Sequence, residues 1–176
     1  MDEEAKIIGQ VQAGCADDFA YLVHRYKSGL FRIVGSLVYS SQVEDIVQET
    51  FIAAFTHICR FDPERGSFRT WLYRIARNLA LNARKKKRDQ PLPENLVIAD
   101  ERTPADDAQT SEIFRRLDQA LEELRFQDRI IFVLADLEGL SYAEIARIEG
   151  LRIGTVKSRL ARARAGLKSV LESYVR

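Results

Sequence analysis

Apolar residues recur at three- and four-residue steps along most of this chain, which is the period of an amphipathic α-helix. Three such runs cover residues 19–38, 43–58 and 71–83 in the first half. In the second half residues 113–124 repeat the period, and residues 130–134 are apolar on every side. No alternation with a period of two persists, so we predict an all-α fold in which residues 130–134 lie in a central helix.

Short polar segments separate these runs. Ser40 and Ser41 interrupt the first pattern and are placed to cap the next helix. Residues 61–66 contain a proline and a glycine and are expected to form a loop. A longer acidic stretch with prolines and no helical period is expected to be a flexible linker between two small helical domains. The expected division is residues 1–89, a linker at 90–110, and residues 111–176.

The strongest local pattern lies near the carboxyl end of the chain. Ser141 with Glu144 fits a capping box, Gly150 suits the positive φ of a tight turn, and Thr155 is placed to cap a second helix. A helix-turn-helix needs a small residue, a glycine and an apolar residue at three fixed positions, because its two helices cross closely. Counted from Tyr142, these places are the fifth, ninth and fifteenth: Ala146, Gly150 and Val156. The inward stripe of the second helix is Val156, Leu160, Ala163, Leu167 and Leu171.

The opposite side of that second helix suits DNA. Small residues along its centre let the backbone approach closely, and Ser158 and Arg162 are placed to reach base edges in the major groove. Long cations at its edges can reach phosphates. These cations are Lys157, Arg159, Arg164 and Lys168. The plainer interpretation is an exposed basic helix in a bundle that binds no DNA.

Composition narrows the class of protein. The chain has 176 residues, of which 46% are hydrophobic and 30% charged, so a globular core is expected. The longest uncharged run, residues 51–59, is too short to span a membrane, and the first residues lack a secretory pattern. Cys15 and Cys59 cannot build a disulfide framework. They are either redox sensors or small buried hydrophobes, and we expect the second, in a soluble, cytoplasmic protein. We expect no metal, no cofactor and no catalytic residue, because no nucleophile pattern or phosphate-binding loop occurs.

Charge is segregated although the net charge is only +1. Residues 69–88 contain eight basic and no acidic side chains, and residues 152–168 contain six basic and no acidic ones. The stretch between these two blocks is rich in carboxylates. Either each block is a solvated helix face or the chain carries two surfaces for a polyanion, and two acid-free blocks favour nucleic acid.

Five segments resemble a known family. Residues 139–146 (GLSYAEIA), 154–160 (GTVKSRL) and 162–164 (RAR) closely resemble region 4 of the extracytoplasmic-function (ECF) sigma factors, which belong to the sigma-70 family of bacterial transcription initiation factors. Residues 45–51 (DIVQETF) resemble the region 2 signature D-x-x-Q-E-x-F, and residues 68–78 (FRTWLYRIARN) resemble its promoter-melting segment. The resemblance spans nearly the whole chain in the right order. It therefore implies a region 2 domain, a linker and a region 4 domain.

Four residues at i, i+3, i+4 and i+7 share one face of the second predicted helix, roughly opposite its apolar stripe. They are Asp45, Gln48, Glu49 and Ile52. An acidic and amide face suits a basic partner, and the resemblance implies the clamp helices of the RNA polymerase β′ subunit. Without the resemblance, an ordinary solvated face is the better interpretation.

Cations and aromatics alternate around the third helix, a combination that holds single-stranded DNA by stacking and charge. The resemblance implies that the loop at residues 61–68 captures a base flipped from the −10 promoter element. We expect Trp71 to belong to the core. Residues expected at the −10 element are Phe61, Phe68, Arg74, Arg77, Asn78, Asn82, Arg84 and Lys85. Residues expected at the −35 element are Arg152, Thr155, Lys157, Ser158, Arg159, Arg162 and Arg164.

The resemblance implies partners and no small-molecule substrate. They are core RNA polymerase through its β′ and β subunits, promoter DNA, and an anti-sigma factor that holds the protein inactive, in some cases at the inner membrane. We expect a monomer when the protein is free. A further hypothesis is that the acidic linker mimics nucleic acid in a polymerase channel, through Asp100, Glu101, Asp106 and Asp107.

Two other functions remain open at this stage. A free-standing helix-turn-helix regulator would usually dimerise on two half-sites, and it would leave the first basic block unexplained. A helical adaptor that binds only proteins would leave both basic blocks unexplained. Promoter binding that requires core polymerase separates the first interpretation from these two.

Overall fold

The computed structural model describes residues 3–87 and 119–174. The expected linker at residues 90–110 lies outside them, with the linker hypothesis on Asp100, Glu101, Asp106 and Asp107, and so does most of the helix expected at residues 113–124. We call residues 3–87 the N-terminal unit and residues 119–174 the C-terminal unit.

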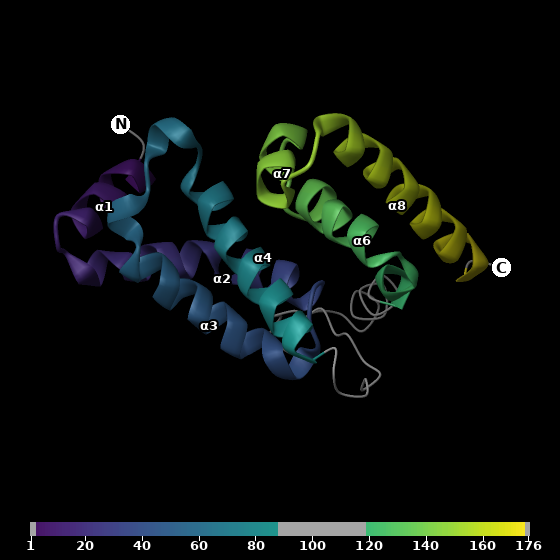
Figure 1. Cartoon of the computed structure of the whole chain (residues 1–176), viewed down its shortest axis with the longest axis horizontal. Helices are drawn as coiled ribbons and strands as arrows, with labels where there is room; N and C mark the ends of the chain where they lie inside the picture. Colours follow the sequence, from purple (N-terminus) through teal and green to yellow (C-terminus); the bar gives the residue numbers. More distant parts are fainter. Residues whose placement is uncertain (1–2, 88–118, 175–176) are drawn as a thin grey trace.

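The N-terminal unit consists of helices connected by short turns (Figure 1). Its helices are α1 (Glu3–Gln12), α2 (Phe19–Gly35), α3 (Ser40–Thr56) and α4 (Phe68–Lys87). Short 3-10 turns lie at Ala16–Asp18, Ile58–Arg60 and Pro63–Arg65. The helix α2 packs against α3 and α4, and α3 packs against α4, so these three helices enclose the core.

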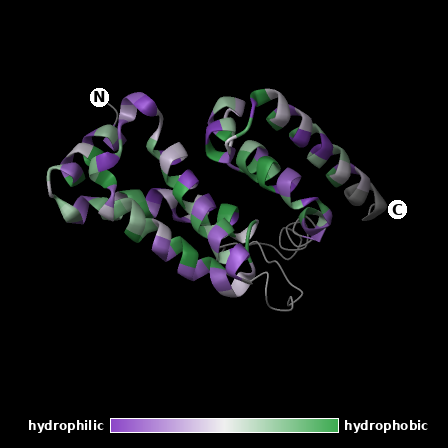
Figure 2. Ribbon diagram, viewed as in Figure 1, coloured by the Kyte–Doolittle hydropathy of each residue, from purple (hydrophilic) through white to green (hydrophobic). Residues whose placement is uncertain are grey.

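The C-terminal unit contains α6 (Phe126–Phe132), a π-helical turn at Val133–Leu137, α7 (Tyr142–Glu149) and α8 (Ile153–Tyr174). The helix α6 packs against α8, and α7 and α8 form the expected helix-turn-helix. Across residues 3–87 and 119–174 there is no strand, which confirms the all-α class. Within single turns the ribbon of Figure 2 changes from apolar to polar, as amphipathic helices require.

The predicted stripes form the core with a few differences. Ile130, Ile131, Val133 and Leu134 are buried, which confirms a central position for this segment. Phe55, within the apolar run at residues 43–58 that was predicted to be buried, is 42% exposed because it lies near the end of α3, edge-on to Phe19. The expectation of buried cysteines is wrong: Cys15 and Cys59 are both exposed, in or beside short 3-10 turns that the core does not cover.

Of the three helix N-caps predicted from the sequence, the structure contains one. Ser141 and Glu144 form the capping box, and Gly150 ends α7 with φ 66° and ψ 36°. The expected cap at Ser40 and Ser41 is wrong, because Tyr39 has the extended backbone of an N-cap and both serines lie in the first turn.

Thr155 was likewise expected to begin the second helix of the helix-turn-helix. The helix α8 begins earlier, at Ile153, so Thr155 lies inside its first turn rather than at its cap. The backbone N–H of Thr155 donates to the carbonyl of Arg152 at 2.9 Å, as a first-turn residue does.

The two units share one core, which the sequence did not indicate. Buried residues of α2 and α4 belong to the same apolar cluster as those of α6, α7 and α8. The helix α4 packs directly against α7, and α2 contacts the π-helical turn. No helix in residues 3–87 or 119–174 is long and apolar enough to cross a membrane.

Candidate nucleic-acid interface

The helix α3 exposes the acidic face expected from its spacing. Asp45, Gln48 and Glu49 are exposed, and Ile52 is 59% exposed. On the other side of α3, Ile46, Val47 and their apolar neighbours are buried. The face therefore combines two carboxylates, an amide and an apolar residue, and it is available to a partner. Its role in polymerase binding stays a prediction.

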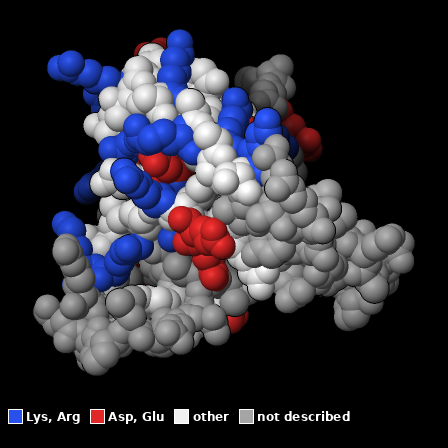
Figure 3. Space-filling model, turned by 90° about the vertical axis from the view of Figure 1, so that its right-hand side faces the viewer, with Lys and Arg blue, Asp and Glu red and all other residues white. Residues whose placement is uncertain are grey.

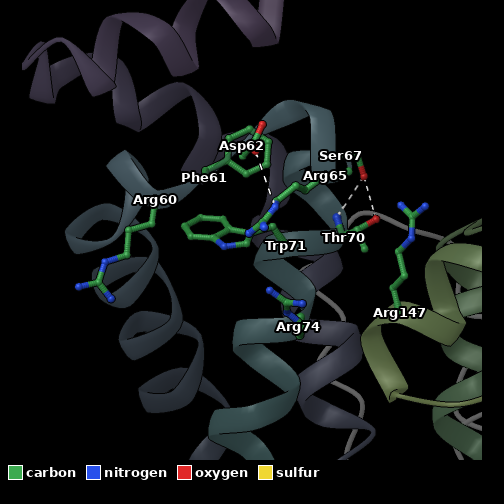
Figure 4. Close-up of a pocket in the computed structure, with 10 residues that line it drawn as sticks. Arg60, Phe61, Asp62, Arg65, Ser67, Thr70, Trp71, Arg74 and Arg147 are labelled. Carbon is green, nitrogen blue, oxygen red and sulfur yellow. Dashed lines mark hydrogen bonds and ion pairs between the residues drawn. The ribbon is translucent and has the colours of Figure 1, made fainter.

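A pocket of about 500 Å³ lies beside the loop that precedes α4 (Figure 4). Its lining contains four arginines, two aromatic rings and two hydroxyl side chains. The lining residues are Arg60, Phe61, Asp62, Arg65, Gly66, Ser67, Thr70, Trp71, Arg74 and Arg147. Guanidinium groups bind phosphate and aromatic rings stack on bases, so the lining suits a nucleotide of single-stranded DNA.

The loop beside the pocket is held by its own short-range contacts. The Asp62 carboxylate accepts a hydrogen bond from the backbone N–H of Glu64 at 3.0 Å, which caps the 3-10 turn at Pro63–Arg65. Gly66 follows with φ 151°, a conformation that favours glycine. A Cβ at Gly66 would lie 3.3 Å from Nη1 of Arg147, the far end of a side chain of the C-terminal unit.

The aromatic residues of the loop are arranged differently from the expectation. Phe61 and Phe68 are 7% and 1% exposed, with ring centroids 5.4 Å apart in an edge-on contact. Trp71, expected in the core, is half-buried and packs 5.5 Å from each of the two rings. Phe68 therefore has no free face for a base in this arrangement, and the half-buried Trp71 is the better stacking surface. Phe61 still borders the pocket.

The helix α4 carries the remaining residues expected at the −10 element. Arg74, Asn78, Asn82, Arg84 and Lys85 are exposed. The guanidinium of Arg84 stacks on Phe126 of the C-terminal unit, 3.9 Å from the ring centroid. Arg77 is half-buried, and its Nε and Nη2 donate to the two carboxylate oxygens of Glu149 at 3.2 and 3.4 Å. The structure thus brings these residues to one helix but engages Arg77 and Arg84 with the other unit.

The helix α8 presents its predicted face to solvent. Of its predicted inward residues, Val156, Leu160, Ala163 and Leu167 are buried, and the side chain of Leu171 lies outside the described ones. Of the residues expected at the −35 element, Arg152, Lys157, Ser158, Arg162 and Arg164 are exposed, and Thr155 and Arg159 are half-buried. Figure 3 views the molecule from the α8 side, where Lys and Arg side chains gather over much of the described surface with carboxylates between them.

Two arginines of α8 are held by carboxylates of their own unit. Arg162 donates through Nε and Nη2 to Asp128 at 3.2 and 3.1 Å, and Arg164 donates in the same way to Asp136 at 2.9 and 2.5 Å. These hydrogen bonds raise the pKa of both guanidinium groups. Asp128 is only 4% exposed, so Arg162 also neutralises a buried charge. The paired carboxylates orient both arginines along α8.

Sequence reasoning missed the contacts between the units. Glu144 receives hydrogen bonds from Thr70 Oγ1 at 3.2 Å and from its own cap residue Ser141. Burial raises the pKa of Glu144, but the Ser141 and Thr70 hydrogen bonds and the charge of Arg69 outweigh it and lower the pKa below its ordinary value of 4.5. No sequence signal identifies such pairs, because their members are 74 residues apart.

One buried cation has no assigned role. The Nε of Arg129 has no hydrogen-bond partner among the described residues, and burial lowers its pKa with a further contribution from nearby Arg84. Within residues 3–87 and 119–174, no group of three or more His, Cys, Asp or Glu side chains could hold a metal ion.

Comparison with known proteins agrees with this geometry. The family model described as "Sigma-70 region 2" matches residues 22–90, and the model described as "Sigma-70, region 4" matches residues 114–167. The first match covers the exposed face of α3, the pocket and α4. The second covers the helix-turn-helix.

Full-length relatives match along nearly the whole chain. The ECF RNA polymerase sigma factor SigW of Bacillus subtilis is 36% identical over 94% of this chain and 95% of its own length. The ECF RNA polymerase sigma-E factor of Escherichia coli K12 is 32% identical over 97% of this chain and 95% of its own length.

Two solved structures are similar in fold. CnrH, in complex with the cytosolic domain of CnrY, has a TM-score of 0.73 and 29% identity, covering 98% of this chain and 99% of that one. RpoE of Bartonella quintana, in complex with the anti-sigma factor NepR, has a TM-score of 0.72 and 29% identity, covering 88% of this chain and 97% of that one. The chain therefore belongs to the ECF RNA polymerase sigma factors of the sigma-70 family, and it is a transcription initiation factor rather than an enzyme.

Proposed function

We propose that this sigma factor binds core RNA polymerase, directs it to promoters that carry a −10 and a −35 element, and promotes melting of the DNA. The observation that carries this proposal is the presence of two exposed, cation-bearing helices, α4 and α8, in two different units of one chain. A single-site regulator needs only one such surface. The proposed domains are residues 1–89 and 111–176, joined by residues 90–110.

Core polymerase is proposed to bind the exposed face of α3. Asp45 and Glu49 supply negative charge, Gln48 supplies an amide, and Ile52 supplies an apolar contact at the same face. This combination suits a basic helical hairpin such as the clamp helices of the β′ subunit, because charge complementarity steers the encounter and the apolar residue adds affinity.

The −10 element is proposed to bind at the pocket and along α4. A base leaving the duplex costs a few kcal/mol, which stacking on Trp71 and contacts with the pocket would offset. Arg60, Arg65 and Arg74 supply positive charge around the pocket. Beyond it, Asn78 and Asn82 are exposed one turn apart, placed to contact the same strand.

The −35 element is proposed to bind the exposed face of α8. Ser158 and Arg162 are exposed along its centre. Asp128 binds one edge of the Arg162 guanidinium, and the other edge can make a bidentate contact with a guanine in the major groove. Exposed cations at the edges of α8 and at its start would contact phosphates. These are Arg152, Lys157 and Arg164, with the half-buried Arg159 between them.

Control by an anti-sigma factor is part of the proposal. Support comes from the likeness to RpoE of Bartonella quintana, which was solved with the anti-sigma factor NepR and covers 88% of this chain. We propose that the protein works in the cytoplasm, where an anti-sigma factor holds it inactive, at the inner membrane if that factor is itself membrane-bound.

In vitro transcription tests the proposal. Core RNA polymerase is incubated with a pool of promoter fragments, with and without this protein, and RNA start sites are mapped. We expect start sites that depend on the protein and that are lost with Asp45→Ala. Tight, sequence-specific DNA binding without polymerase, together with no new start site, would instead establish a free-standing regulator.

A further inference from the structure

The loop that borders the pocket is held at its start by the first helix of the chain. The helix α1 packs against the 3-10 turn at Ile58–Arg60, which leads into this loop (Figure 1). Gln12 is the last residue of α1 and is half-buried. Its Nε2 donates to the backbone carbonyl of Ile58 at 2.9 Å and to that of Phe61 at 3.0 Å. One side chain therefore joins both ends of the turn to the end of α1.

The second of these bonds fixes the direction in which the chain leaves the turn. Inside the turn, the N–H of Arg60 donates to the carbonyl of His57 at 2.9 Å, and the N–H of Phe61 donates to the carbonyl of Ile58 at 3.0 Å. Phe61 itself has an extended backbone, with φ −72° and ψ 129°, so its carbonyl lies beyond the turn's own hydrogen bonds. The amide of Gln12 therefore holds a carbonyl at which the turn has ended and the loop begins.

The residues held in this way belong to the pocket. Arg60 and Phe61 line it beside Trp71, as Figure 4 shows. The ring centroid of Phe61 lies 5.5 Å from that of Trp71. A change in the course of the backbone at Phe61 would therefore move both a cation of the pocket and the ring that packs on the tryptophan. Gln12 acts on the pocket in this way although it does not line it.

The helix α1 is itself firmly anchored. Ile8 and Val11 are 6% and 5% exposed and belong to the shared apolar core. Near the start of α1, the carboxylate of Glu4 accepts a hydrogen bond from the hydroxyl of Tyr26 and pairs with Nε of Arg25 at 2.9 Å. The start and the middle of α1 are thus fixed, so its last residue can hold the loop in a defined place.

We propose that Gln12 is a positioning residue for the −10 element, because its amide holds Arg60 and Phe61 in the arrangement that receives a base of the melted strand. This inference rests on the proposed function, since it concerns the pocket assigned there to the −10 element. It adds a residue of α1, which precedes the residues 22–90 that match the region 2 model.

Gln12→Met tests this role with little change in size, because it removes both donors and adds no charge. The probe is a labelled single-stranded oligonucleotide with the −10 sequence of a start site mapped as above, bound to the complex of the protein with core polymerase. Two neutral hydrogen bonds are lost, so we expect the affinity for this oligonucleotide to fall about 5- to 30-fold. The affinity for a duplex that carries only the −35 element should be unchanged.

Gln12→Lys is the rescue variant, because an ammonium group on a longer stem can donate to both carbonyls. Gln10 supplies the matched controls: it lies in the same helix, is also half-buried, and its side chain has no hydrogen bond to another described residue. Gln10→Met controls for the change of side chain, and Gln10→Lys controls for the added charge. We expect Gln10→Met to bind the oligonucleotide as the wild type does, and Gln12→Lys to bind it as tightly as Gln10→Lys does.

A second measurement needs neither DNA nor polymerase. Trp71 is the one tryptophan of the chain and is half-buried, so quenching of its fluorescence by acrylamide reports on the loop in the free, full-length protein. We expect stronger quenching in Gln12→Met than in the wild type. Gln12→Lys and Gln10→Met should be quenched as the wild type is.

The outcomes separate this role from mere support of the fold and from the proposed function. Unchanged oligonucleotide binding in Gln12→Met, an equal loss of binding to both promoter elements, or a loss that Gln12→Lys does not restore would each overturn the positioning role. If Gln12→Met does not fold, as judged by circular dichroism, Gln12→Ser decides the result. A wild-type complex that does not bind the oligonucleotide overturns the proposed function, whatever the quenching shows.

Discussion

The helices α4 and α8 are both basic, both exposed on one side and both proposed to bind DNA, yet their cations are held in different ways. Arg162 and Arg164 of α8 pair with Asp128 and Asp136 of the same unit. Arg77 of α4 pairs instead with a carboxylate of the opposite unit. The surface on α8 is thus complete within its own unit, whereas part of the surface on α4 is occupied by its neighbour.

This difference separates two roles of a carboxylate beside a DNA-binding arginine. A carboxylate in the same unit orients the arginine and can remain in place while the other edge of the guanidinium contacts DNA. A carboxylate in another unit competes with DNA for the same cation. The same arginine–carboxylate pair can therefore support DNA recognition in α8 and compete with it in α4.

The largest effect is expected from the core that the two units share. Leu160→Ala removes a buried side chain of α8 and should lower the free energy of unfolding by about 2–5 kcal/mol. Because the cluster continues into α2 and α4, a calorimetric scan of the wild type should show one cooperative transition. Two transitions, of which Leu160→Ala shifts only one, would contradict the shared core.

Next in size is the loss of Arg162. Removing a bidentate base contact costs about 1–3 kcal/mol, so Arg162→Ala should reduce transcription from a promoter with an intact −35 element about 5- to 150-fold. Asp128→Asn is the control, because it keeps Arg162 and one acceptor oxygen beside it and removes only the negative charge. Promoter recognition should largely survive Asp128→Asn, measured as start-site use with core polymerase. If both variants lose start-site use to the same extent, Arg162 contributes to the folded structure and not to promoter recognition.

An effect of comparable free energy is expected at the loop of the N-terminal unit. Gly66→Ala places a side chain at φ 151° and 3.3 Å from Arg147, which should destabilise the loop by about 1–3 kcal/mol. Promoter melting, followed by permanganate reactivity of thymines, should weaken while binding to the −35 element is unchanged. Normal melting with this variant would argue against the loop as the −10 site.

The smallest effect is expected from lowering the pH below about 4.5. Against the effect of burial, the hydrogen bonds from Ser141, and after them Thr70 and Arg69, lower the pKa of Glu144 in the folded protein below its ordinary value of 4.5, so its carboxylate stabilises the folded protein above that value. This contribution is lost progressively as the pH falls below 4.5 through the folded pKa. The free energy of unfolding, measured by denaturant titration, should therefore fall in acid for the wild type and less for Glu144→Gln. The same acid response in both proteins would assign the transition to other groups.

Periodicity and local chemistry were enough to predict much of the fold. The apolar stripes, the capping box at Ser141 and the turn at Gly150 depend on neighbours close in sequence, and the structure confirms them. The exposed faces of α3 and α8 followed from the same helical spacing.

Other features depended on contacts that no local pattern contains. The burial of Phe68 and the half-exposed position of Trp71 follow from how the loop folds back on α4. Glu138 lay in an unremarkable segment, and its partners Arg32 and Tyr73 are 106 and 65 residues away. Such pairs are fixed by the packing of whole helices, so they emerge only with the structure.

The central claim is that α4 binds one promoter element and α8 binds the other. It is tested most directly by selecting functional promoters from a randomised pool with core polymerase. Three proteins are compared: the wild type, Arg162→Ala in α8 and Asn78→Ala in α4. We expect the wild type to enrich two sequence blocks, Arg162→Ala to lose only the upstream block, and Asn78→Ala to lose only the downstream block. A single enriched block with the wild type, or loss of the same block in both variants, would contradict the assignment of one element to each helix.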